Sequence, residues 1–257
     1  MTHPPSSFIW YELMTTDVDA ASRFYGGVVG WTVQRASTPG MDYRMWMMGD
    51  TAVGGLLAIS ADASASGMRP TWMGYANVAD VDVTLVDIQA AGGAVHMPAT
   101  DIPDVGRIAM ITDPQGAALY VMAPKGTGTS RAFSPAEQGH CGWHELHTQG
   151  WEAAFEFYSK HLGWRKSDAL DMGPMGMYLL FNAGGEAIGG MMNNPNLGRP
   201  QWLFYFNVDD IQSAKNRVET AGGAVLQGPH QVPGGGWIIQ GRDPQGAMFA
   251  LFNPPGG

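Results

Sequence analysis

One phrase of the sequence occurs twice. "WYELMTTDVDAASRFY" begins at Trp10, and "WHELHTQGWEAAFEFY" begins at Trp143, 133 residues later. Each copy reads W-x-E-L, continues with polar residues and ends an amphipathic run in F-Y. A repeat restricts the fold strongly, because both copies are expected to form the same structural unit.

Further matches extend this repeat along the chain. "GW" begins at residues 30 and 163, a Gly-Gly pair at 54 and 189, "AGGAV" at 91 and 221, and "DPQG" at 113 and 243. The offsets between copies differ by only a few residues, so the insertions are small. The sequence therefore predicts a tandem duplication with a first domain over 1–124, a linker over 125–139 rich in Gly, Ser, Thr and Pro, and a second domain over 140–257.

Within each half, the pattern predicts a strand, a helix and three strands, in two successive modules. Residues 8–14 alternate as a strand does, and Thr16 or Asp17 offers a cap to the following helix. Strands are expected near 31–37, 42–48 and 52–59. A second helix begins near Val81 and stops at the Gly-Gly pair at 92, and "DPQG" suits a type I turn between strands.

Alternation along the first strand separates its side chains into two faces. Trp10 and Glu12 lie on one face and Leu13 on the other. We assign the Trp10 face to a concavity of the sheet and the Leu13 face to the helix. In the second copy, Trp143, Glu145 and His147 would line the corresponding hollow.

The order and spacing of these motifs resemble those of the vicinal oxygen chelate superfamily, which includes glyoxalase I, bleomycin-resistance proteins and extradiol dioxygenases. The resemblance rests on D-x-x-x-A-x-x-F-Y after the first strand, the G-W, the A-G-G and the D-P-x-G turn, each present twice. It implies an α+β fold of two tandem glyoxalase-like domains. Each domain would be a pair of βαβββ modules forming a curled, incompletely closed mixed β-sheet with helices outside.

The resemblance also implies a divalent metal held by His, Glu or Gln from four strand positions. In this sequence those positions hold Trp10, Gly55, Met73 and Tyr120 in the first half and Trp143, Gly190, Leu203 and Ala250 in the second. None of these side chains is a standard ligand for a hard divalent cation. We therefore expect no metal and no cofactor.

The stretch "HCGWHELH" was considered as a replacement metal site. It contains His140, Cys141, His144, Glu145 and His147. On a strand, successive residues of one face lie roughly 7 Å apart, which is too far for neighbours to share one ion without bending. The expected interpretation is a set of partly exposed polar residues at the start of a strand.

Glu12, Glu145 and His147 are the candidate catalytic residues. A carboxylate in an aromatic hollow could accept a proton. A purely structural role for Glu12 and Glu145 is the alternative, because a duplication would copy a structural glutamate as readily as a catalytic one. His147 has Met14 as its counterpart, so the second half is the better candidate for catalysis.

Five further residues are candidates for ligand binding. Tryptophans at matching strand positions could stack on a planar ligand or simply belong to the core. An arginine before the first "DPQG" could bind an anionic group or lie in solvent. These residues are Trp10, Trp72, Trp143, Trp202 and Arg107.

These features leave two principal functions. The first is a metal-free small-molecule binding protein of the glyoxalase and bleomycin-resistance type, which encloses an apolar or aromatic ligand. The alternative is a lyase, isomerase or dioxygenase-like enzyme that acts through Glu12, Glu145 or an undetected divalent metal. A scaffold whose cavities are filled by its own side chains is a third possibility.

Charge and composition narrow the partners. A net charge of −9 disfavours nucleic acid and anionic membranes. No membrane span or signal peptide is evident in the sequence, and the single Cys141 fits a reducing compartment, so a cytoplasmic location is expected. We expect a monomer that is a pseudo-dimer of its halves, or a homodimer.

Overall fold

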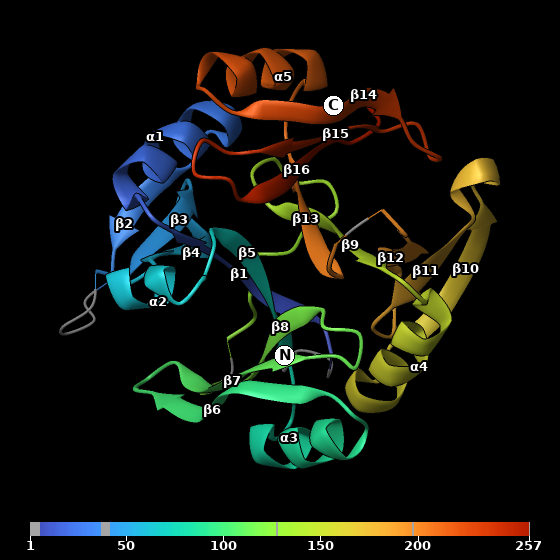
Figure 1. Ribbon diagram of the computed structural model, residues 1–257. Helices are drawn as coiled ribbons and strands as arrows, with labels where there is room; N and C mark the ends of the chain where they lie inside the picture. Colours follow the sequence, from blue (N-terminus) through green and yellow to red (C-terminus); the bar gives the residue numbers. More distant parts are fainter. Residues whose placement is uncertain (1–5, 37–41, 127, 197, 257) are drawn as a thin grey trace. The chain divides into compact units, whose positions relative to one another are not determined.

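The structure is a computed structural model that describes residues 6–36, 42–126, 128–196 and 198–256 (Figure 1). The elements of the first half are β1 (Phe8–Thr15), α1 (Val18–Val29), β2 (Thr32–Arg35), β3 (Arg44–Met48), β4 (Thr51–Ala58), α2 (Ala61–Ala65), β5 (Thr71–Asn77), α3 (Val81–Ala90), β6 (Ala94–Ile102), β7 (Gly106–Thr112) and β8 (Ala118–Pro124).

The second half repeats this order, and its described residues contain no counterpart of α2. Its elements are β9 (Cys141–Thr148), α4 (Trp151–Leu162), β10 (Arg165–Asp171), the 3-10 turn η1 (Gly173–Met175), β11 (Met177–Asn182), β12 (Ala187–Asn193), β13 (Gln201–Asn207), α5 (Ile211–Thr220), β14 (Ala224–Gln231), β15 (Trp237–Arg242) and β16 (Met248–Asn253). The short α2 was not predicted from the sequence. Residue 37, the expected end of the second strand, lies outside the described residues.

The strands form two mixed sheets of eight, in the orders β2-β3-β4-β1-β5-β8-β7-β6 and β10-β11-β12-β9-β13-β16-β15-β14. Each βαβββ module closes on itself through one parallel pair, as β1 does with β4 and β9 with β12. The remaining pairs within a module are antiparallel, as in β10-β11-β12. The predicted α+β fold with two tandem glyoxalase-like sheets is confirmed.

The first helix of the first half begins at one of its two expected caps, whereas α4 follows Gly150, which makes no side-chain cap. Asp17 caps α1 by accepting hydrogen bonds from the backbone N–H groups of Asp19 and Ala20. Gly30 and Gly163 end α1 and α4 in the left-handed region, with φ of 93° and 72°. Each glycine begins the repeated G-W, and the tryptophan that follows it stacks on the tyrosine of the preceding helix.

The chain divides into two compact units, and each draws on both halves of the repeat. One unit consists of Met1–Ile9, Gly74–Ser130 and Trp143–Trp202 and holds most of β5–β8 together with β9–β12. The other consists of Trp10–Met73, Arg131–Gly142 and Leu203–Gly257 and holds most of β1–β4 together with β13–β16. We call these the β9 unit and the β1 unit. The sheets follow the tandem repeat, whereas the compact units join modules from different halves.

In the β9 unit, the repeated motifs of the two halves bind each other. The hydroxyl of Tyr158, the last residue of "FEFY" in α4, donates a hydrogen bond of 3.1 Å to Asp113 of the first "DPQG". The other oxygen of Asp113 accepts from the backbone N–H groups of Gln115 and Ala117. Burial raises the pKa of the Asp113 carboxyl, although these hydrogen bonds oppose the shift.

The β1 unit contains the same arrangement with the halves exchanged. The hydroxyl of Tyr25 on α1 donates to Asp243 of the second "DPQG" at 3.1 Å. In this unit α1 also contacts α5, which lies along β14 and β15 (Figure 1). The repeated F-Y and D-P-Q-G motifs therefore join different halves of the chain.

Trp72 and Trp202, predicted as walls of a binding site, belong to the buried cores of the two units. They are 4% and 6% exposed. The indole N–H of Trp72 donates to the hydroxyl of Tyr25, and that of Trp202 to the hydroxyl of Tyr158. Buried indoles require a partner for this N–H, and the helix tyrosines supply it.

This arrangement predicts the behaviour of an isolated half. A fragment of residues 1–130 would leave Tyr25 without Asp243 and Asp113 without Tyr158, and would expose aromatic side chains that are buried in the whole chain. We expect this fragment to self-associate, and to form a 1:1 complex when it is expressed together with 131–257. Sedimentation and native mass spectrometry would show this. A compact, cooperatively unfolding monomer of 1–130 would contradict it.

Candidate functional site

A buried carboxylate in the β9 unit lies at the centre of a continuous hydrogen-bonded group. Glu145 is on β9, and alternation along this strand places Trp143 and His147 on the same face. The hydroxyl of Tyr178 donates to Oε2 of Glu145 at 2.8 Å, and Nε2 of His147 lies 2.7 Å from Oε1. Both carboxylate oxygens therefore have a partner.

Tyr178 reaches Glu145 from β11, across the intervening strand β12. The residue of β12 opposite Glu145 is Gly190, and a Cβ added there would overlap the ring of Tyr178. The ring lies over this glycine, and its hydroxyl accepts a hydrogen bond of 2.8 Å from the indole N–H of Trp143. The absence of a side chain at position 190 is therefore what allows Tyr178 to join Trp143 to Glu145.

The outer end of the group is an amide. Nδ2 of Asn194 lies 3.3 Å from Nδ1 of His147. An amide N–H donated to Nδ1 leaves the imidazole proton on Nε2, where it points to the Glu145 carboxylate. The side chains of His147 and Glu145 remain 10% and 9% exposed, so the pair is buried but not sealed.

Electrostatics keeps the tyrosine protonated. Burial raises the pKa of the Tyr178 hydroxyl well above its usual value, and the neighbouring Glu145 charge raises it further. The group thus presents a neutral phenol that donates to a carboxylate. We call Trp143, Tyr178, Glu145, His147 and Asn194 the Glu145 cluster.

The β1 unit contains part of the same arrangement. The indole N–H of Trp10 donates to the hydroxyl of Tyr43 at 2.9 Å, and a Cβ at Gly55 would overlap that hydroxyl. Gly55 lies opposite Glu12, which is 5% exposed. The position of His147 is occupied by Met14, so this unit has no imidazole at that place.

Tyr43 and Tyr178 were missed by the sequence analysis. A signal for them exists, because they are separated by 135 residues, the same offset that separates Gly55 from Gly190. Aligning the two halves at this offset would have paired the two tyrosines. Their partnership with the glutamate strand could not be read, since they lie two strands away from it.

Arg107, a candidate for binding an anionic group, is engaged in ion pairs in the β9 unit. Its guanidinium contacts Asp82 at 2.8 Å and Asp101 at 3.1 Å. These hydrogen bonds raise the pKa of Arg107. Arg107, on β7, therefore forms ion pairs with an aspartate of β6 and an aspartate in the first turn of α3.

The polar stretch before Glu145 is buried, contrary to the expectation of partial exposure. His140 is 3% exposed and Cys141 and His144 are fully buried. Nδ1 of His144 bonds the carbonyl oxygen of Ile188 at 2.6 Å, and its ring stacks on Phe8. Hydrogen bonds to main-chain groups and ring stacking allow this histidine to be buried.

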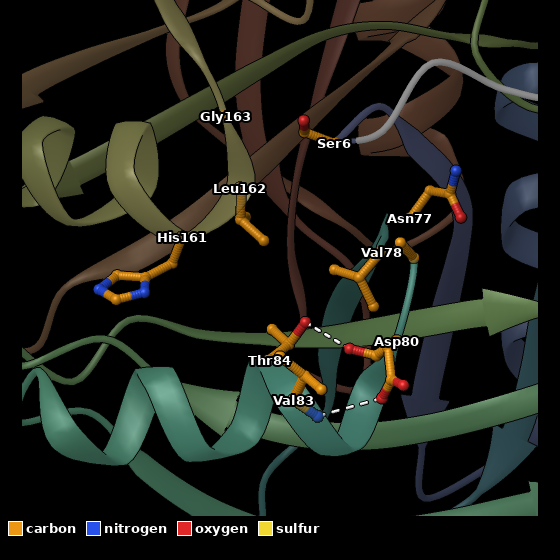
Figure 2. A pocket seen from close by; sticks show the side chains of 10 residues that line it. Ser6, Asn77, Val78, Asp80, Val83, Thr84, His161, Leu162 and Gly163 are labelled. Atoms are coloured by element: carbon orange, nitrogen blue, oxygen red, sulfur yellow. Dashed lines mark hydrogen bonds between the residues drawn. The ribbon is translucent and has the colours of Figure 1, made fainter.

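A pocket of about 290 Å³ lies elsewhere in the β9 unit (Figure 2). It is bounded by Ser6, the start of α3 and the end of α4, where His161 and Leu162 lie. Asp80 there caps α3 by accepting from the backbone N–H of Val83. None of its lining residues belongs to the Glu145 cluster.

The sequence profile of the Glyoxalase/Bleomycin resistance protein/Dioxygenase superfamily matches residues 7–121 and 138–251. The chain belongs to this superfamily. It is similar to the "Putative glyoxylase CFP32" of Mycobacterium tuberculosis, at 35% identity over 95% of this chain and 94% of the relative. It also resembles the "Anthracycline biosynthesis protein DnrV" of Streptomyces peucetius, at 30% identity over 96% and 93%.

Two solved structures of the superfamily share the fold. The 3,4-dihydroxyphenylacetate complex of homoprotocatechuate 2,3-dioxygenase from Brevibacterium fuscum superposes with a TM-score of 0.69 at 13% identity, covering 98% of this chain and 82% of that one. The Mn(II)-bound glyoxalase from Novosphingobium aromaticivorans does so with a TM-score of 0.66 at 16% identity, over 97% and 82%.

The side chains of this superfamily member do not fit a divalent metal. Within the described ranges, no group of three or more His, Cys, Asp or Glu side chains is placed to hold an ion. Glu145 and His147 offer two donors, and each is bound to the other. A site of hard cation chemistry requires more oxygen or imidazole ligands than this pair supplies.

The substitution Gly190→Ala tests whether the ring of Tyr178 lies directly over residue 190. The added methyl group must displace the Tyr178 ring, so we expect a loss of about 1–3 kcal/mol in the free energy of unfolding and a change in the near-ultraviolet circular dichroism of Trp143. Gly185→Ala, in the loop before the same strand, meets open space and should change stability by less than about 0.5 kcal/mol. Equal effects of the two substitutions would contradict the packing described.

Because His144 is buried in its neutral form, we expect the free energy of unfolding to decrease in acid. Burial lowers the pKa of His144 to about 3, below its value of about 6.5 in the unfolded chain. The neutral form is favoured in the folded state, so its contribution is complete above about pH 6.5 and falls by up to about 1.4 kcal/mol per pH unit toward pH 3.

Denaturant titrations between about pH 6 and pH 4 would measure this slope. His144→Phe should flatten it, while replacement of the exposed His230 by Gln should leave it unchanged. An unaltered slope in His144→Phe would show that another group controls the acid lability.

Proposed function

We propose that this protein is an enzyme of the lyase or isomerase type that transfers a proton of a small organic substrate through Glu145. The observation that carries the proposal is the paired Glu145 carboxylate and His147 imidazole, buried among aromatic side chains and still partly accessible. A carboxylate in such surroundings is a suitable proton acceptor, and the adjacent imidazole N–H stabilises its charged form.

Four of the five members of the Glu145 cluster have a part in this proposal. Glu145 accepts a proton from a carbon or hydroxyl group of the substrate and later gives it to the product or to solvent, while the Nε2–H of His147 donates to the carboxylate. Tyr178 and Trp143 hold the carboxylate in one orientation. No step is assigned to a metal, because the donor set does not fit one.

The surroundings of the carboxylate favour an aromatic or apolar substrate. Trp143, Tyr178 and Met192 are half-buried, and Met192 pairs with both Tyr178 and His147 across neighbouring strands. A relative named as an anthracycline biosynthesis protein and a fold neighbour solved with 3,4-dihydroxyphenylacetate support the same substrate class, because both names concern aromatic compounds.

The two halves are proposed to differ in activity. The residue two positions after Glu12 is Met14, where the second half has His147. We assign proton transfer to Glu145 and a binding or structural role to Glu12 and Trp10.

A second candidate function is metal-free binding of an apolar or aromatic compound, in the manner of the bleomycin-resistance branch. It is favoured by the tryptophan and glycine at the expected ligand positions of both halves, which offer contact area and no metal donor. Binding without turnover would distinguish it from catalysis.

The proposed setting is the cytoplasm, with a small molecule as the partner. Among the described residues, no helix is long and apolar enough to cross a membrane. The one cysteine, Cys141, is buried and forms no disulfide. The pairing of modules from both halves supports a monomer, with a homodimer as the alternative, and the net charge of −9 disfavours nucleic acid and membranes as partners.

The test combines a substrate screen with paired substitutions. Ligands among aromatic ketones, quinones and 2-oxo aldehydes would first be found by thermal shift and then assayed for turnover or for exchange of a carbon-bound proton with deuterated water. Glu145→Gln should lower kcat/KM by roughly 10²–10⁴-fold while ligand binding persists, since the amide keeps the shape and loses the base.

Two matched variants complete this test. Glu12→Gln repeats the substitution in the other half and should retain turnover, and His147→Met copies the first half and should slow it. Turnover by Glu145→Gln equal to that of the unaltered protein would contradict the proposal. Ligand binding without any turnover would favour the binding protein instead.

A further inference from the structure

Two glycines, Gly55 and Gly190, occupy strand positions at which the resemblance implies metal ligands. A glyoxalase that shares the fold was solved with Mn(II) bound. Both glycines lie opposite a buried glutamate on the neighbouring parallel strand. The space above each of them is occupied by a tyrosine.

We infer that the glutamate face of each half does not fit the divalent cation that the resemblance implies, because a tyrosine hydroxyl, of Tyr178 in the second half and of Tyr43 in the first, fills the space above the glycine at an expected ligand position. In each half the hydroxyl accepts from a tryptophan indole N–H, at 2.8 Å from Trp143 and 2.9 Å from Trp10. These tryptophans and glycines occupy the strand positions at which ligands were expected. One tyrosine therefore engages two of those positions at once.

The hydrogen bonds of Tyr178 and His147 compete with a cation at Glu145. The tyrosine has one proton, which it gives to Oε2, while Oε1 is held by His147. A metal ion would have to remove the ring from above Gly190 and break both contacts. The raised pKa of Tyr178 keeps it a neutral phenol, which is a weak metal ligand.

The hydroxyl performs one task that a cation would perform. It supplies a fixed partner to the carboxylate and limits its orientations, which makes Tyr178 a positioning residue for Glu145. It supplies no Lewis acidity, so it cannot polarise a substrate carbonyl as a metal ion does. The chemistry open to the site is then proton transfer or binding, without metal activation.

The repetition within one chain is independent support. The halves have diverged beside the glutamate, where His147 is matched by Met14. They nevertheless share the tryptophan, the tyrosine and the glycine in the same geometry. The Trp-Tyr-Gly arrangement therefore does not depend on the imidazole.

The inference predicts metal affinities that can be measured without a substrate. Tag-free, chelator-treated protein would be titrated with Mn²⁺, Ni²⁺ and Zn²⁺ by calorimetry and equilibrium dialysis. We expect no stoichiometric binding by the unaltered protein. One tightly held ion per half, lost on Glu145→Gln or Glu12→Gln, would overturn the inference.

A combined variant tests whether these side chains keep the glutamate face from holding a cation. Trp143→His, Gly190→His and Tyr178→Ala together remove the ring and place two imidazoles beside Glu145 and His147. We expect this variant to bind one Zn²⁺ or Ni²⁺ at least about tenfold more tightly than the unaltered protein. A folded variant that fails to bind would show that these side chains are not what keeps a cation from Glu145.

The single variant Tyr178→Phe provides a second test that can be used if the combined variant does not fold. The ring then still covers Gly190, so no metal should bind, while the indole N–H of Trp143 loses its acceptor. Its proton resonance should shift and exchange faster with water, and Tyr43→Phe should affect only Trp10. An unchanged Trp143 resonance would contradict the arrangement. These readouts do not require turnover, so the inference and the proposed function can fail separately.

Discussion

A charged carboxylate removed from water must find hydrogen-bond donors, and the Glu145 site is built on this requirement. Tyr178 and His147 meet it, one at each oxygen. Tyr178 can reach the carboxylate from two strands away only because Gly190 has no side chain. The glycine, the tyrosine and the tryptophan that holds the tyrosine therefore depend on one another.

Because of the duplication, the chain has two glutamate faces, one in each half. The two halves are also joined by hydrogen bonds between their repeated motifs. Tyrosines of one half bond the "DPQG" aspartates of the other, at Tyr158 and Asp113 and again at Tyr25 and Asp243. These contacts involve the parts of the repeat that are most alike. The halves differ at their glutamate faces, where His147 of the second half is matched by Met14 in the first. Shared residues thus maintain the fold, and the divergent position distinguishes the proposed reactive half from the other.

Much of the fold could be predicted from the sequence, because the repeat, the Asp17 cap and the glycine helix ends are local signals. Alternation along the first strand of each half also grouped Trp143, Glu145 and His147 correctly on one face. It could not tell that Trp72 and Trp202 lie in the core, since a period of two does not show which face is covered. Tyr178 was missed because its role depends on a glycine and a glutamate on other strands.

The central claim is that a tyrosine hydroxyl, and not a cation, is the partner of the Glu145 carboxylate. The most direct measurement is the anomalous scattering of crystals soaked in Mn²⁺. We expect no manganese peak beside Glu145, and a Tyr178 hydroxyl that stays hydrogen-bonded to both Trp143 and the carboxylate. A manganese ion bound to Glu145, with Tyr178 displaced from above Gly190, would contradict it.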